Sequence, residues 1–213
     1  MGDKEKDMKE ERLSLYDIMK KDLEDEILHG VKVSRLAFLL ARKVGFSYER
    51  AKELSIAGFL HDMGKLKMSR YLYGRDEKSL DVEEMIRKRS HVRLGYDILM
   101  RYDYSDFILE TILYHHENYD GTGYPRNLVA TDIPSGARVL RIVDMFVTLT
   151  SDRPYRKAFD KDAAVELLIE EVKNFDMRYF LAFLNMIHEI DIDEIIHFPK
   201  MEVDLCAKDD NFI

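Results

Sequence analysis

The sequence predicts an all-α fold on three observations. Apolar residues recur at the three- and four-residue spacing of helices, and no segment shows the alternation of a half-buried strand. Glycines separate these apolar stripes, as is typical of helix ends and turns. Short polar residues stand before several stripes, where N-caps are expected. Such a pattern favours one compact bundle of helices.

Helical spacing accounts for the chain up to Leu60. One apolar stripe covers residues 10–29, and a second runs from Val33 to Val44. Gly45 is expected to end this helical region. Ser47 stands where an N-cap belongs, so the next helix should begin there and continue through Leu60.

The same helix is expected to carry His61-Asp62 near its end, and Gly64 is expected to terminate it. Between Lys65 and Ser90 the pattern is weaker. Residues 74–78 are expected to form a loop, and residues 82–89 a short helix.

The C-terminal half shows five further helical stripes and a long irregular segment that ends at Pro134. A helix begins at His91, and another ends at the pair His115-His116. Asp160 and Asp176 are expected to cap the last two helices. The later helices are expected over Ser135 to Thr150, Lys161 to Lys173 and Asp176 to Ile190, with a possible short strand at Val203 to Cys206.

One folded unit is expected from these patterns. It lies between a charged N-terminal helical segment at residues 1–24 and a C-terminal tail at residues 191–213. The chain has 213 residues and is 46% hydrophobic, which is enough for a single core.

Composition also limits location and partners. No apolar run approaches the roughly 20 residues that cross a bilayer, and the charged N-terminus lacks an apolar signal core. A cytoplasmic protein without a membrane partner is therefore expected. The net charge of −8 argues against a nucleic-acid polymer as partner, because such binding needs a basic surface. A small anion stays compatible, since bound divalent ions would create a local positive field.

Histidines and acids stand where they could bind metal. His61 and Asp62 are adjacent, so on a helix their side chains diverge by about 100° and could serve two ions, or one ion and a bridge. Asp25 precedes His29 by one helical turn and shares its face. Asp144 lies within an apolar helix, where an ionised carboxylate needs a partner such as a metal ion. These residues favour a metallohydrolase.

Three motifs resemble those of the HD-GYP domains, a branch of the HD metallohydrolase superfamily. The segment His61 to Lys65 is similar to the HDxGK element, and the segment His115 to Pro125 is similar to the HHExxDGxGYP element. Residues 137–158 resemble a third conserved stretch. The resemblance covers about residues 25–185. It implies that residues 25–190 form the catalytic domain, a compact helical bundle of the HD-domain type with a GYP loop.

The resemblance implies a metal-dependent phosphodiesterase. Its substrate would be cyclic di-GMP, a bacterial second messenger, and its product linear pGpG, while further cleavage to GMP stays open. A hydroxide that bridges the metals would attack phosphorus. Two or three divalent ions are expected, iron first and manganese next. A diguanylate cyclase or another signalling protein is a candidate partner.

The resemblance also implies roles for individual residues. The first ion would be bound by His29, His61, Asp62 and Asp144, and the second by His91, His115, His116 and the bridging Asp62. Asp25 stands at the position of a glutamate that can hold a third ion. Asp62 and Lys65 would be the catalytic residues, and Lys65 would orient the nucleophile or a phosphate oxygen. The substrate contacts would be Lys65, Tyr124, Arg153 and Arg156.

Two alternative functions stay open at this stage. One is an HD phosphohydrolase acting on another cyclic dinucleotide or phosphoester, which is favoured by Val147, where the family often repeats an aspartate. The other is an inactive cyclic di-GMP receptor or protein-interaction module. A structural ion-pair network is the alternative reading of Arg153 and Arg156.

Overall fold

The computed structural model describes residues 15–66, 89–153, 156–191 and 195, with side chains from Leu23 onward. In these ranges every regular element is helical, apart from one isolated bridge between Arg153 and Arg156, and the expected all-α fold is confirmed. The helices are α1 (Leu15–Lys43), α2 (Tyr48–Leu60), α5 (His91–Leu99), α6 (Asp106–Tyr114), α7 (Ser135–Leu149), α8 (Lys161–Glu170) and α9 (Met177–Glu189), with 3-10 turns at Ala130–Asp132 and Val172–Asn174.

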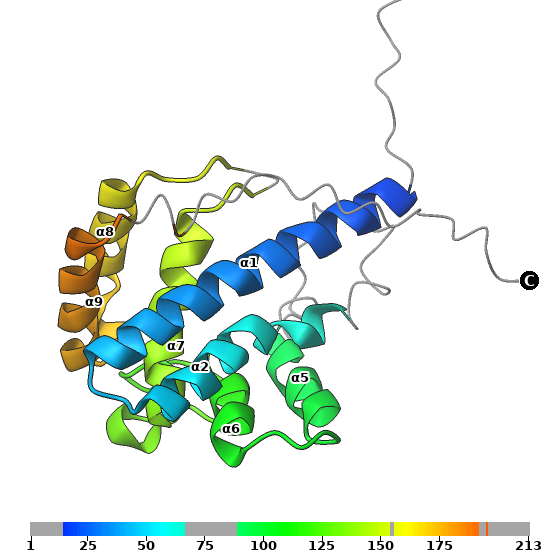
Figure 1. Ribbon diagram of the computed structural model, residues 1–213, viewed down its shortest axis with the longest axis horizontal. Coiled ribbons are helices and arrows are strands. Elements are labelled where there is room, and N and C mark those ends of the chain that lie inside the picture. Colours follow the sequence, from blue (N-terminus) through cyan, green and yellow to red (C-terminus); the bar gives the residue numbers. More distant parts are fainter. Residues whose placement is uncertain (1–14, 67–88, 154–155, 192–194, 196–213) are drawn as a thin grey trace, which may run out of the picture.

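Helix α1 is the longest element, and Figure 1 shows it (blue) extending across the molecule. It runs without interruption from Leu15 to Lys43, so the backbone has no break at the expected boundary between residues 24 and 25. Gly45 follows its end with φ of +91°. The Phe46 amide donates to the Ala41 carbonyl at 2.9 Å, which is the closing bond of a Schellman motif.

Helix α2 ends before Gly64. It begins after Ser47, whose Oγ accepts a hydrogen bond from the Arg50 amide at 3.2 Å, and this confirms the expected N-cap. It ends at Leu60, His61 and Asp62 form a turn, and residues 63–66 are helical again. The expectation that Gly64 terminates the helix is therefore wrong. Gly64 instead permits a close contact with the start of α5, as described below.

Helix α7 forms the centre of the core. It is buried around most of its circumference, as a hydrophobic helix at the middle of a bundle must be. Helices α1, α2, α8 and α9 surround it and share one large apolar cluster that includes Leu36, Leu54, Phe146 and Phe183. A second cluster joins the end of α2 to α5 and α6. The histidines and aspartates on or next to α1, α2, α5, α6 and α7 thus lie where these two clusters meet.

The remaining helix predictions are largely confirmed. Helix α5 begins at His91, α6 ends just before His115, and α7 ends just before Thr150. Asp160 and Asp176 cap α8 and α9 through their side-chain oxygens. Helix α8 is shorter than expected, because a 3-10 turn follows it. The predicted loop at residues 74–78, the predicted helix over residues 82–88 and the predicted strand at residues 203–206 lie outside the described residues. Among the helices described, none has the length and apolarity to cross a membrane.

Candidate metal centre

The turn after α2 orients His61 for metal binding. Its Nδ1 lies 2.8 Å from the carbonyl oxygen of Gly58, three residues earlier. A carbonyl only accepts, so Nδ1 must carry the proton, and the lone pair of the neutral ring is on Nε2. His115 repeats this arrangement at the end of α6, where its Nδ1 donates to the Ile112 carbonyl at 2.7 Å. Both rings therefore present Nε2 to the interior.

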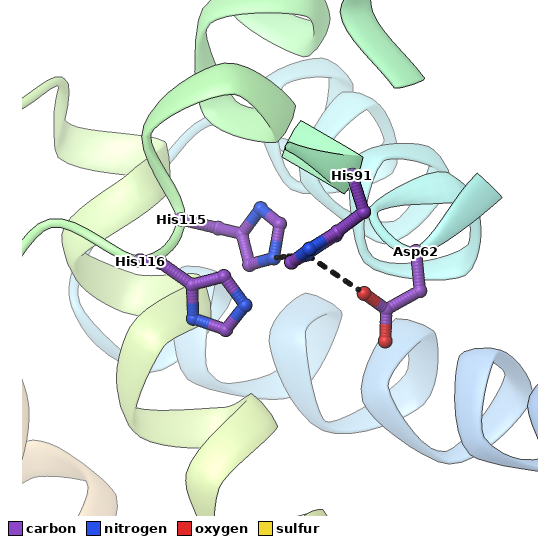
Figure 2. A group of neighbouring side chains, drawn as sticks. All are labelled: Asp62, His91, His115 and His116. Carbon is purple, nitrogen blue, oxygen red and sulfur yellow. Dashed lines mark hydrogen bonds and ion pairs between the residues drawn. The ribbon is translucent and has the colours of Figure 1, made fainter. Parts of the chain in front are cut away.

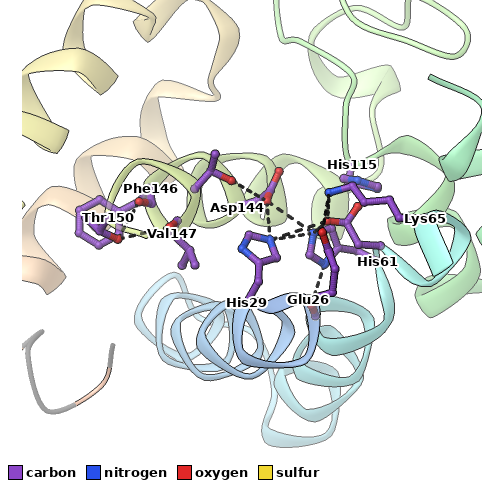
Figure 3. Close-up of polar contacts among 12 residues, drawn as sticks. Glu26, His29, His61, Lys65, His115, Asp144, Phe146, Val147 and Thr150 are labelled. Atoms are coloured by element: carbon purple, nitrogen blue, oxygen red, sulfur yellow. Dashed lines mark hydrogen bonds and ion pairs between the residues drawn. The ribbon is translucent and has the colours of Figure 1, made fainter. Parts of the chain in front are cut away.

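One group of potential ligands joins α1, the end of α2 and α7. Ligand atoms of His29, His61, Asp62 and Asp144 all lie within 4.8 Å of one another, and all four side chains are buried. His29 Nε2 is 3.1 Å from Asp144 Oδ1, and His61 Nε2 is 3.1 Å from Asp62 Oδ2. Figure 3 shows His29, His61 and Asp144 converging from three helices.

A second group shares Asp62 with the first. Ligand atoms of Asp62, His91, His115 and His116 also lie within 4.8 Å of one another. His91 Nε2 is 3.3 Å from Asp62 Oδ1 and 3.4 Å from His115 Nε2 (Figure 2). The two oxygens of Asp62 therefore face different groups, Oδ2 the first and Oδ1 the second. A carboxylate in this position can bridge two ions.

The electrostatics of both groups suit a divalent cation. Burial, together with the neighbouring imidazoles, holds the pKa of His115 well below its usual range, and burial lowers the pKa of His116 to about 3. Both rings are therefore neutral near pH 7, as metal ligands must be. Burial opposes ionisation of Asp144, but hydrogen bonds from His29 and His61 outweigh it and hold its pKa well below the usual value. The carboxylate is therefore ionised.

His61 shows where a positive charge is favoured. Burial alone would lower its pKa, but the charges and hydrogen bonds of Asp62 and Asp144 raise the pKa to about 10. A cation placed against Nε2 of His61 is thus stabilised by two buried carboxylates. Asp62 Oδ1 is buried and has no hydrogen-bond partner in the described part of the chain. Imidazole and carboxylate donors of this kind suit iron, manganese, zinc or nickel.

Gly64 brings the two ligand groups together. A Cβ atom built at this position would lie 2.0 Å from the backbone oxygen of His91 and 2.8 Å from the amide nitrogen of Gly95. The chain just after Asp62 therefore touches the first turn of α5 directly. Only glycine leaves room for this contact, which sets the distance between Asp62 and His91.

The segment after α6, residues 117–134, is called the GYP loop here. Glu117 is buried, and its two oxygens accept hydrogen bonds from the amides of Arg126 at 2.6 Å and Leu128 at 3.0 Å. The Tyr124 amide donates to the His116 carbonyl at 3.1 Å, and the two rings lie 4.9 Å apart. The loop thus folds back on His116 and fixes its position.

A cavity of about 490 Å³ opens beside the metal centre. Its lining includes three cationic side chains, two members of the ligand groups and two further residues of α7: Lys65, Arg141, Arg153, His116, Asp144, Met145 and Thr148. Lys65 forms an ion pair with Asp62 and lies 3.9 Å from Glu26. Burial opposes the charge of Lys65, but these two acids outweigh it and raise its pKa.

Not every expected site residue lies at the centre. Asp25 is exposed and belongs to neither ligand group; Glu26 reaches the site instead, and its Oε2 is buried without a hydrogen-bond partner in the described residues. Arg156 does not line the cavity, because its guanidinium donates to the carbonyls of Thr148 and Leu149 at the end of α7. The structural role left open for Arg156 is therefore the better supported one.

Val147 has a clear place in the structure. Its side chain is fully buried in the apolar core between α7 and its neighbours. The next residue, Thr148, lines the cavity, and its Oγ1 lies 3.5 Å from Asp144 Oδ1. Thr148, and not Val147, is therefore the residue that this turn of α7 presents to the cavity.

Comparison with known proteins assigns the class of this chain. Residues 13–179 match the HD domain family, and the chain belongs to that family. It is 37% identical over 157 residues to the cyclic di-GMP phosphodiesterase response regulator RpfG of Xanthomonas campestris, a match covering 72% of this chain and 41% of the relative. It is 34% identical over 146 residues to 3'3'-cGAMP-specific phosphodiesterase 1 of Vibrio cholerae, covering 68% and 33%.

A solved structure shows the same fold. The HDG"Y"P protein of Bdellovibrio bacteriovorus superposes with a TM-score of 0.62 at 20% identity, over 83% of this chain and 55% of that one. The expected HD-domain bundle is confirmed by this likeness. The chain spans less than half the length of either curated relative.

Removal of metal offers a first test of the centre. A ligand that binds only the folded state stabilises it by about 2.7 kcal/mol when present at roughly 100 times its dissociation constant. For a domain of this size, a chelator is therefore expected to lower the unfolding temperature by roughly 5–10 °C. Differential scanning calorimetry with and without EDTA measures the shift. An equal shift in a variant that lacks Asp62 would show that the chelator acts elsewhere.

Proposed function

We propose that this chain is a metal-dependent phosphodiesterase that hydrolyses cyclic di-GMP to linear pGpG, and then to GMP. The observation that carries the proposal is the carboxylate of Asp62, shared between two buried ligand groups beside a cation-lined cavity. The names of the two relatives support a cyclic dinucleotide as the substrate class.

The residues present fit two divalent ions. His29, His61, Asp62 and Asp144 would hold one, and Asp62, His91, His115 and His116 the other. Iron is the first candidate and manganese the second, because mixed imidazole and carboxylate ligands accept both. For a third ion we propose Glu26, with Asp25 as the alternative, since Glu26 reaches Lys65 and has a buried oxygen without a partner among the described residues.

Ions bound there would supply Lewis-acid chemistry, which activates water and neutralises phosphate charge. The side chains around the centre position the substrate. Lys65 is held by Asp62 at the edge of the cavity and would donate to a phosphate oxygen. Arg153 also lines the cavity, where its Nη2 donates to Thr148 Oγ1 at 3.4 Å. It would hold the substrate together with Tyr124. Water adds to phosphorus, and the 3' oxygen leaves with a proton.

The Vibrio cholerae relative favours one alternative, in which the preferred substrate is a different cyclic dinucleotide. The test incubates metal-reconstituted protein separately with cyclic di-GMP, 3'3'-cGAMP and cyclic di-AMP, and separates the products by chromatography. We expect pGpG from cyclic di-GMP at the highest rate. Faster cleavage of another dinucleotide would move the assignment to that substrate, and binding without any product would identify a receptor.

A further inference from the structure

One face of α7 borders the cavity beside the metal centre. Arg141, Asp144, Met145 and Thr148 all line this cavity. Their spacing of three, four and seven residues places them on one side of the helix. Asp144 belongs to the first ligand group, so Arg141 lies about one turn before a candidate ligand. No motif in the sequence assigns a role to Arg141.

The guanidinium of Arg141 is held at one nitrogen. Its Nε donates to Asn118 Oδ1 at 3.0 Å, and Asn118 Nδ2 donates to Thr122 Oγ1 at 3.0 Å, so the GYP loop fixes the position of this arginine. Within the described ranges, no carboxylate lies within 4.0 Å of Arg141, and neither Nη group donates to a protein acceptor. These two groups can therefore donate to a ligand.

Two nearby arginines use their Nη groups differently. Arg138 Nη1 donates to Asp176 Oδ2 at 2.6 Å, in a largely buried ion pair. Arg156 Nη2 donates to the Thr148 carbonyl at 2.7 Å. Both arginines are thus occupied by the protein itself. Arg141 differs from them because its donors face the cavity and not a protein acceptor.

The position of Arg141 relative to the centre is also defined. Its charge adds to the burial that lowers the pKa of His116, and it acts in the same direction on Tyr124. Arg141 therefore lies on the side of the cavity where the second ligand group and the GYP loop meet. Lys65 and Arg153 line the same cavity. The cavity thus has three cationic side chains in addition to the two candidate metal sites. This is more positive charge than the binding of one phosphate requires.

We propose that Arg141 binds the phosphate of a cyclic dinucleotide that is not being cleaved, and so selects ligands with two phosphodiesters over ligands with one phosphate. This inference rests on the proposed function. The paired Nη donors match two phosphate oxygens. A phosphate also carries the negative charge that a guanidinium neutralises, whereas a guanine base is uncharged. Phosphate is therefore the better fit.

The test compares affinities on metal-loaded protein. Competition against a fluorescent cyclic di-GMP, at a temperature where no product forms during the measurement, gives dissociation constants for cyclic di-GMP, 3'3'-cGAMP, cyclic di-AMP and GMP. Arg141→Met removes the charge and keeps the apolar stem, whereas Arg141→Lys keeps the charge and loses the paired donors. Arg178→Met is the matched control, because Arg178 is exposed on α9.

For Arg141→Met we expect affinity for all three cyclic dinucleotides to fall by about 10- to 100-fold, the range for a charged hydrogen bond. GMP should stay within about two-fold, since its one phosphate binds at the ions. Arg141→Lys should give a smaller loss, and Arg178→Met none. Thermal unfolding of each variant checks that the fold is intact.

Several results would overturn the assignment of Arg141. Unchanged affinity of Arg141→Met for cyclic dinucleotides would show that Arg141 does not bind the substrate. An equal loss of affinity for GMP would show that Arg141 has a structural role. A loss confined to guanine-containing dinucleotides would mean that Arg141 reads the base. If the wild type binds but cleaves nothing, the hydrolytic function fails while the affinities still decide the role of Arg141. If the wild type binds no cyclic dinucleotide, both proposals fail.

Discussion

Replacing Asp62 with alanine is expected to abolish turnover and to empty both halves of the metal centre. One oxygen of this carboxylate faces each ligand group, so the substitution removes a ligand from both. A loss of roughly 4 kcal/mol of charge stabilisation corresponds to about a 10³-fold lower rate. Elemental analysis and product chromatography on the same preparation measure metal content and activity together.

The matched control for this variant is Asp97→Ala. Asp97 is an exposed acid on α5 that pairs with Arg93 at 3.0 Å, away from the ligand atoms. It should retain full metal content and wild-type activity. Normal turnover in Asp62→Ala would contradict the shared-carboxylate arrangement. Retention of one full ion in that variant would show that Asp62 serves a single group.

A second large effect is expected for Gly64→Ala. The added Cβ would meet the His91 carbonyl at 2.0 Å, and backbone atoms cannot move aside as a flexible side chain would. Overpacking of this severity costs about 3 kcal/mol, which for a domain of this size lowers the unfolding temperature by roughly 6–12 °C. Because the clash separates Asp62 from His91, affinity for the second ion should also fall.

Gly95→Ala provides the contrast for Gly64→Ala. Gly95 is also buried and helical, but a Cβ there would have only ordinary contacts, the nearest at 3.4 Å. Alanine is also preferred over glycine in a helix interior by about 1 kcal/mol. Gly95→Ala is therefore expected to leave the unfolding temperature unchanged or to raise it. Equal destabilisation by both substitutions would refute the specific contact between Gly64 and His91.

Helix ends and candidate ligands were readable from the sequence because their determinants are local. Gly45 and Asp160 act within one turn of chain, and each ends or begins a helix as expected. The histidines and aspartates of the two ligand groups were identified from short motifs, and the structure brings all of them together. Convergence of five helices at one point could be inferred only through the family resemblance.

Residues chosen by the rotation of a helix were harder to read. Asp25 and Glu26 both lie within about 60° of His29 around the axis of α1, so spacing alone cannot choose between them. The structure distinguishes them, because Lys65 lies 3.9 Å from Glu26 at the edge of the metal centre. Spacing from Asp144 was a signal that could have identified Arg141, since a residue one turn earlier shares the same face.

Long-range contacts account for the remaining differences. Gly64 has the sequence signature of a helix end, but its packing against His91 explains why glycine is required. Arg156 lies in a motif associated with substrate binding, yet the carbonyls exposed at the end of α7 take up its donors. His91 follows Gly64 by 27 residues, and the carbonyls that bind Arg156 lie seven and eight residues before it. Local spacing in the sequence therefore shows neither contact.

Anomalous diffraction from crystals of the iron- or manganese-loaded protein tests the shared metal centre most directly. We expect two peaks about 3.5–4 Å apart, one beside His29, His61 and Asp144 and the other beside His91, His115 and His116, with an oxygen of Asp62 on each. A single peak, or two peaks that Asp62 does not join, would contradict the arrangement on which the proposed chemistry depends.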